Sequence, residues 1–142
     1  MTTVHTLDSD FLSSVNYESL SCYKDRDTRA IPSMEGTEGL LKDDYSQRNR
    51  AIQKFAVAAL TWGYQMFAIQ DGGMCVGSPD AHKVYGKYGK SQDCKNDGKG
   101  GTMPNQVYNL TGTMERGKDN CKLKADLLIL CYLSYLFFGI LF

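Results

Sequence analysis

Few residues in this chain have the types and spacing that catalysis requires. The two histidines are His5 and His82, and no Gly-x-Ser-x-Gly, His-Glu-x-x-His or phosphate-loop pattern occurs. Cys75 and His82 could in principle form a nucleophile and base pair. A disulfide or buried thiol at Cys75, with a structural hydrogen bond at His82, explains both residues better. We therefore expect no enzymatic activity and no cofactor.

Metal-binding patterns are also weak. Acidic and amide residues in the segment 93–98 superficially suggest a calcium loop, but their spacing does not match Asp-x-Asn-x-Asp-Gly with a distal Glu, and lysines interrupt it. Asx-type turns account for the same residues. No Cys-x-x-Cys occurs, so zinc and thioredoxin-type redox sites are poorly supported. We expect no metal site.

Tyrosines in polar surroundings are more suggestive of binding. A flat apolar ring with a polar tip suits stacking on a sugar ring, whose hydroxyls Asp, Asn and Gln can satisfy. Four residues flank two loops that we expect to lie beside one another, and they are the candidate ligand-binding residues: Asp71, His82, Tyr85 and Tyr88. The alternative interpretation is that the tyrosines fill a small core, with their hydroxyls at its rim. Asn109-Leu110-Thr111 is an N-glycosylation sequon, meaningful only in an exported protein.

The clearest secondary-structure signal lies between Ser46 and Trp62. Apolar residues there follow a helical spacing that gathers them on one face, namely Ile52, Phe55, Ala56, Ala59 and Leu60. Ser46 is a candidate N-cap, and Gly63 follows the last periodic residue as a candidate left-handed C-cap.

Shorter signals flank this helix. Residues 64–70 have a strand pattern that ends at the turn Asp71-Gly72-Gly73, and 74–76 are expected to return as a short strand. Residues 80–88 predict one or two helical turns, and 106–110 predict a closing strand. Residues 1–21 show neither period, so we expect a disordered N-terminal segment followed by a domain over 22–110.

Composition limits the classes of partner and compartment. The 16 basic and 16 acidic side chains cancel, which argues against nucleic acid because phosphate binding needs a basic field. Only 20 of the 31 Leu, Ile, Val and Phe residues precede Leu127, so the hydrophobic core is small and we expect the domain to need covalent cross-links. Five cysteines could form disulfide bonds, which indicates an oxidising compartment. Residues 1–21 contain no export-signal pattern, so either the start is incomplete or the compartment is reducing.

The C-terminal region divides into a polar linker, 111–124, and a hydrophobic tail, 125–142. Residues 127–142 carry no charge, and as a helix they would reach about 24 Å, short of a hydrocarbon core of roughly 30 Å. Three interpretations remain open: a lipid-anchor signal, a short membrane segment, or non-coding sequence read through by the gene model.

Several short phrases occur together between Cys22 and Leu110. They are Cys22-Tyr23-Lys24-Asp25, Arg29-Ala30-Ile31-Pro32, Phe67-Ala68-Ile69-Gln70-Asp71-Gly72-Gly73-Met74-Cys75, Ala81-His82-Lys83-Val84-Tyr85-Gly86-Lys87-Tyr88-Gly89, and Gly98-Lys99-Gly100-Gly101 before Val107-Tyr108. In order and spacing they resemble WSC domains, most of all the divergent versions in extracellular proteins of marine invertebrates. The resemblance implies a small, loop-rich, disulfide-stabilised α+β domain in which one amphipathic helix packs on an antiparallel sheet.

The resemblance also bears on the cysteines. Phe55 stands where these domains usually place a cysteine, which leaves three cysteines within 22–110. If the missing cysteine normally pairs with Cys75, a Cys22–Cys94 disulfide survives and Cys75 is a buried thiol against Phe55. In a rival arrangement, Cys121 pairs with one of the three.

The function that the resemblance implies is non-enzymatic. We expect an extracellular binding module that recognises carbohydrate and is secreted or held at the cell surface, with a glycan or a matrix component as its partner and membrane attachment through the tail as one option. The alternatives are a structural or adhesive matrix protein that recognises protein, and a degenerate fragment of a larger extracellular multidomain protein.

Overall fold

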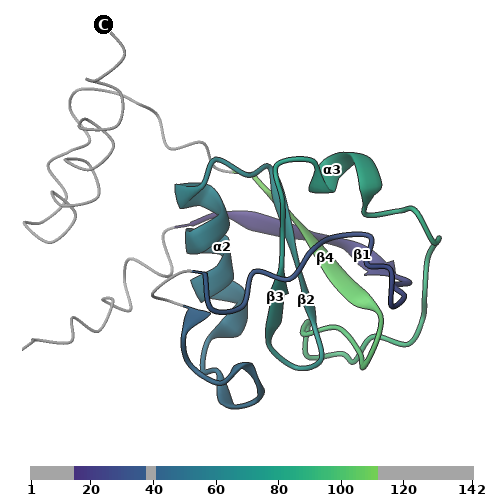
Figure 1. Ribbon diagram of the computed structural model, residues 1–142, viewed down its shortest axis with the longest axis horizontal. Helices are drawn as coiled ribbons and strands as arrows, with labels where there is room; N and C mark the ends of the chain where they lie inside the picture. The colour runs from purple at the N-terminus through teal and green to yellow at the C-terminus, as the bar shows by residue number, and fades with distance from the viewer. Residues whose placement is uncertain (1–14, 38–40, 112–142) are drawn as a thin grey trace, which may run out of the picture.

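The computed structural model describes residues 15–37 and 41–111. The predictions for residues 1–14, for the linker beyond Thr111 and for the hydrophobic tail lie outside these ranges. The elements in chain order are β1 (Tyr17–Tyr23), the 3-10 turn η2 (Tyr45–Gln47), α2 (Ala51–Thr61), β2 (Met66–Gln70), β3 (Met74–Val76), α3 (Ala81–Val84) and β4 (Asn105–Leu110). One sheet with one principal helix beside it makes this an α+β domain, as predicted (Figure 1).

The sheet has four antiparallel strands in the order β1-β4-β2-β3. β2 and β3 form a hairpin, whereas β4, the last strand of the described part, lies between β2 and β1. In the register, Phe67 pairs with Tyr108, and Cys22 pairs with Gln106. The first and last strands of the domain are therefore neighbours, and residues far apart in the sequence share one surface.

Both faces of the sheet are covered. On one face, α2 packs against Phe67, Ile69 and Tyr108. On the other face, α3 and the segment that contains Ile31 cover Ala68 and Val107. All five residues of β2 are buried as a result, which explains why this strand is a continuous apolar run ending in Gln70 rather than an alternating one.

The predicted apolar face of α2 is confirmed. Phe55, Ala56 and Ala59 are fully buried, and the rings of Phe55 and Phe67 meet edge to face with their centroids 5.3 Å apart. Small alanines bring the helix close to the sheet, so a core with few large side chains is still filled.

Gly63 ends α2 as predicted. Its φ of 75° is left-handed, a conformation open to glycine without steric cost. The N–H of Tyr64 donates to the carbonyl of Ala59 and the N–H of Gly63 donates to that of Leu60, at 2.9 and 3.0 Å. These two bonds form a Schellman motif that satisfies the last carbonyls of the helix.

The predicted helix start at Ser46 is wrong. Asp44 caps only the short turn η2, by accepting a hydrogen bond from the N–H of Ser46. The chain is then extended at Arg48 and left-handed at Arg50, and α2 begins at Ala51. The physical reason is the buried Arg48 side chain, which is held by the contacts described below and interrupts the helical path.

The predicted start of the domain at Cys22 is also wrong, because β1 begins at Tyr17. Most of this edge strand is exposed, and its pairing with β4 shifts register between Ser19 and Ser21. A bulge in an edge strand interrupts the alternation of apolar and polar residues that is typical of strands. The sequence of β1 therefore shows no strand pattern.

Among the described residues, no helix is both long enough and apolar enough to cross a membrane.

Cys75 is a free, fully buried cysteine, and it lies in the same apolar cluster as Phe55. Burial raises the pKa of its thiol well above the usual range, although the nearby Arg48 guanidinium opposes the shift. Since the thiolate is the reactive form, we expect Cys75 in the folded, oxidised chain to react with iodoacetamide roughly a hundredfold more slowly than in denaturant. Peptide mapping by mass spectrometry would measure this, and rapid native labelling would contradict the burial.

Candidate binding surface

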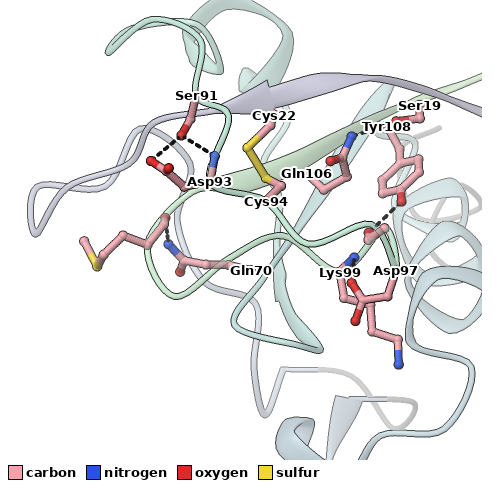
Figure 2. Close-up of a disulfide and its surroundings, with 12 residues drawn as sticks. Ser19, Cys22, Gln70, Ser91, Asp93, Cys94, Asp97, Lys99, Gln106 and Tyr108 are labelled. Atoms are coloured by element: carbon pink, nitrogen blue, oxygen red, sulfur yellow. Dashed lines mark hydrogen bonds between the residues drawn. A yellow bond between two sulfur atoms is a disulfide. The ribbon is translucent and has the colours of Figure 1, made fainter.

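One disulfide joins the first strand to the loop that precedes the last. The Cα atoms of Cys22 and Cys94 are 5.9 Å apart although 72 positions separate them in sequence. Figure 2 shows the bond between β1 and the loop, beside a turn in which Ser91 Oγ donates to Asp93 Oδ2 at 3.0 Å. The N–H of Ser91 also donates to the carbonyl of Cys22 at 3.0 Å. The segment before Cys94 is thus fixed against β1, and the predicted pairing is confirmed.

The structure places three of the four candidate ligand-binding residues in one segment, α3 and the turns after it. Tyr85 is half-buried, and its ring packs edge to face against Tyr23 with centroids 4.9 Å apart. Tyr88 donates its hydroxyl to the carbonyl of Thr28 at 2.5 Å. His82 is half-buried, and its Nδ1 is buried without a hydrogen-bond partner among the described residues.

Two cations lie against the Tyr88 ring. The guanidinium carbon of Arg26 is 4.8 Å from the ring centroid, and Lys87 Nζ is 5.1 Å from it. Both distances are within the range of cation–π attraction. The ring is therefore a platform for positive charge.

Asp71 is not part of this group. It lies in the β2–β3 turn, at the opposite end of the hairpin from α3 (Figure 1). Its N–H donates to the carbonyl of Gly101 at 2.8 Å, and its carboxylate accepts a bond from the Tyr45 hydroxyl at 3.3 Å. The expectation that the two flanking loops lie side by side is wrong, because β3 carries the chain away from the turn before α3 begins.

Cys75 and His82 do not form a pair. Cys75 belongs to the cluster under α2, whereas α3 covers the other face of the sheet. The sheet thus separates the thiol from the imidazole.

An ionic cluster surrounds the buried side chain of Arg48. Its guanidinium donates to both Glu35 carboxylate oxygens at 2.9 and 2.8 Å, to Asp43 Oδ1 at 2.8 Å and to the carbonyl of Gly73 at 3.0 Å. The same Glu35 accepts the backbone N–H of Cys75 at 2.7 Å. Burial alone would lower the pKa of Arg48, but the bonds to Glu35 and Asp43 outweigh it and raise the pKa. This cluster joins Glu35, Asp43 and Arg48 to β3 and to the turn before it.

A second polar cluster collects residues that are far apart in the sequence. Arg29 Nη1 donates to Gln70 Oε1 at 2.7 Å, Asn105 Nδ2 donates to Asp25 Oδ2 at 3.2 Å, and Asp25 Oδ1 accepts the N–H of Ala30 at 2.8 Å. Asp25, Gln70 and Asn105 are buried, and only Oδ1 of Asn105 lacks a partner among the described residues. The cluster closes the interior between β2, β4 and the loop after β1.

Hydrogen-bonded turns hold the segment 93–98, which superficially resembles a calcium loop in sequence. The N–H of Lys99 donates to Asp97 Oδ1 at 2.9 Å, an Asx turn, and the Tyr108 hydroxyl donates to the carbonyl of Gly98 at 2.6 Å. Burial, followed by the nearby Tyr17 and Asp97, raises the pKa of Tyr108 to about 12. Within 15–37 and 41–111, no group of three His, Cys, Asp or Glu residues could hold a metal ion.

Asn109, the sequon residue, is half-buried on β4. Its Nδ2 donates to Glu18 Oε1 at 3.3 Å across the β1–β4 pair. Modification at this nitrogen stays a prediction.

The sequence pattern does not predict that basic residues gather near Tyr88. They are dispersed as Lys24, Arg26, Lys87 and Lys90, with no run of like charges. The local signal is that two of them, Lys24 and Lys87, directly adjoin a tyrosine.

These features define a class of protein: a small α+β domain with a four-stranded antiparallel sheet, one principal helix and a disulfide that fixes an aromatic segment to the edge strand. Comparison with protein-family models, curated proteins and solved structures found no match.

Proposed function

We propose that this chain is an extracellular or cell-surface binding module, non-enzymatic and of WSC-like type, that recognises carbohydrate. The disulfide supports the compartment, because such bonds persist in oxidising environments and are rare in the cytosol. The domain is also polar and thin in core residues, a composition that depends on such staples.

The observation that carries the proposal is the way Tyr85 and Tyr88 are held. Both are half-buried in a segment that is attached to β1 by the disulfide and to the 24–28 loop by the Tyr88 hydroxyl. An aromatic surface ordered before binding loses little conformational freedom when a ligand arrives. Rings with one apolar face and a polar tip suit a sugar at a wet surface.

The two ends of the hairpin give a direct test. The oxidised full chain, secreted with a supplied export signal, is applied to a glycan array and then titrated with the best ligand. We expect Tyr88→Ala to weaken binding about tenfold or more, as the loss of one stacking ring does elsewhere. Tyr45→Ala is the matched control, because Tyr45 is a half-buried tyrosine at the Asp71 end, and it should change affinity less than twofold.

The other outcomes are also decisive. A loss with Tyr45→Ala or Asp71→Asn, but not with Tyr88→Ala, would move the site to the β2–β3 turn. No glycan binding by the parent chain would overturn carbohydrate recognition and favour the protein-binding alternative. Tyr88→Phe keeps the ring, so it separates loss of the ring from loss of the bond to Thr28.

A further inference from the structure

Four basic residues gather around Tyr88, and we call Lys24, Arg26, Lys87 and Lys90 the cationic surface. Two segments far apart in sequence bring them together. The N–H of Lys24 donates to the carbonyl of Gly89 at 2.9 Å, and Tyr23 and Lys90 form an antiparallel bridge. The Tyr88 hydroxyl bonds to Thr28, and its ring lies against Arg26 and Lys87. All four cations are exposed.

The charge of this surface is not neutralised within the described part of the chain. The ion pairs there involve Arg29, Arg48, Lys54 and Lys83, and none includes a member of the cationic surface. Nearby carboxylates are largely engaged, since Asp25 is buried in its own cluster and Asp80 pairs with Lys83 at 2.7 Å. Two exposed carboxylates remain nearby: Asp27 in the loop, and Asp93, which lies three positions after Lys90 and accepts a hydrogen bond from Ser91. A chain with no net charge thus carries a locally positive surface.

Resting on the proposed carbohydrate recognition, we propose that the ligand is a polyanionic glycan whose sulfate groups bind the cationic surface. Guanidinium and ammonium groups are the side chains that bind oxyanions. Disulfides persist in oxidising environments and are rare in the cytosol, and in the proposed extracellular setting sulfate esters on polysaccharides supply such anions. Nucleic acid and the anionic cytoplasmic leaflet lie in other compartments.

The test compares two pairs of substitutions that remove the same charge. The full oxidised chain is titrated with heparin and with desulfated heparin by calorimetry. Arg26→Gln combined with Lys87→Gln should lower heparin affinity roughly tenfold, on the scale of two exposed charge contacts. Lys42→Gln combined with Lys99→Gln is the control, because it removes the same charge at the opposite end of the β2–β3 hairpin. The carbonyl of Lys99 accepts the N–H of Gly72 in the turn, and Lys42 adjoins Asp43, which bonds to Arg48. Asp27→Asn should strengthen binding.

Salt and competing polyanions complete the test. Heparin affinity should fall steeply as NaCl rises from 50 to 300 mM, since exposed charges are screened. Equal affinity for desulfated heparin, or equal losses in both charge pairs, would overturn the inference. So would tighter binding to phosphatidylserine vesicles or to duplex DNA. Binding of neutral glycans alone would overturn it while leaving the proposed function intact, whereas the absence of any glycan binding would overturn both.

Discussion

Arg48→Met is expected to destabilise the domain by about 3–5 kcal/mol, the usual cost of removing one partner from a buried ionic cluster. The side chain of Arg48 is fully buried, whereas those of Glu35 and Asp43 are partly exposed. Its loss would leave the Glu35 carboxylate beside the backbone of Cys75 without a counter-charge, and the carbonyl of Gly73 without its donor. Urea unfolding followed by fluorescence would measure the change.

Lys54→Met is the matched control for Arg48→Met. Lys54 also pairs with Asp43, at 3.0 Å, but on the surface, so its loss should cost less than about 1 kcal/mol. Arg48→Lys keeps the charge but lacks the planar guanidinium whose donors reach Glu35 and Gly73 together. We therefore expect its loss of stability to lie between those of Arg48→Met and Lys54→Met. Similar losses for Arg48→Met and Lys54→Met would show that the buried cluster adds no stability.

The same cluster predicts a dependence on pH. Burial acts to raise the pKa of Asp43, but the bonds from Arg48 and Lys54 outweigh it and lower the pKa below its usual 3.8. The stability that this carboxylate contributes is therefore present above about 3.8 and is lost as the pH falls through the lowered value. In Arg48→Met this acid-dependent loss should be smaller.

Removal of the disulfide is the second large expected effect. Cys22→Ala combined with Cys94→Ala should lower the free energy of unfolding by roughly 4 kcal/mol, because the bond closes a loop across 72 positions and restricts the unfolded chain. Small domains hold only about 5–15 kcal/mol in total, so the variant should be close to unfolding at physiological temperature. Thermal and urea unfolding of the variant, and of the parent with and without reductant, would measure this.

Cys75→Ala controls for the loss of a cysteine as such. It leaves the disulfide intact and removes one small apolar group from the cluster under α2, so we expect a loss of about 1 kcal/mol. If the double variant lost no more than Cys75→Ala, the staple would be dispensable, and the argument for an extracellular domain would lose its main support.

Several elements could be predicted from local sequence because their signals are local. The apolar period of α2, the glycine after it and the turn at Asp71-Gly72-Gly73 each depend on residues within one or two turns of chain. The Cys22–Cys94 pairing was implied only by the resemblance, on the condition that the cysteine replaced by Phe55 normally pairs with Cys75. A count of cysteines alone leaves the pairing open.

Other features depend on partners distant in sequence. Strand β1 exists because β4 pairs with it from about 90 positions away, through contacts such as Asn109 with Glu18. Arg48 interrupts the predicted helix because it is bound by Glu35, Asp43 and Gly73, on either side of it in the chain. Secondary-structure propensities depend on local sequence, so they do not predict contacts of this kind.

For the candidate site, the residue types were visible in the sequence, but their neighbours were not. His82, Tyr85 and Tyr88 share one short segment, so their proximity follows from the sequence. The tertiary structure alone separated Asp71 from them, and it alone brought Arg26 and Lys87 to the Tyr88 ring. The physical reason is that the spacing of apolar residues along a helix or strand shows which face of that element each residue occupies. The distance between two loops is set instead by strand length and by the order of strands in the sheet.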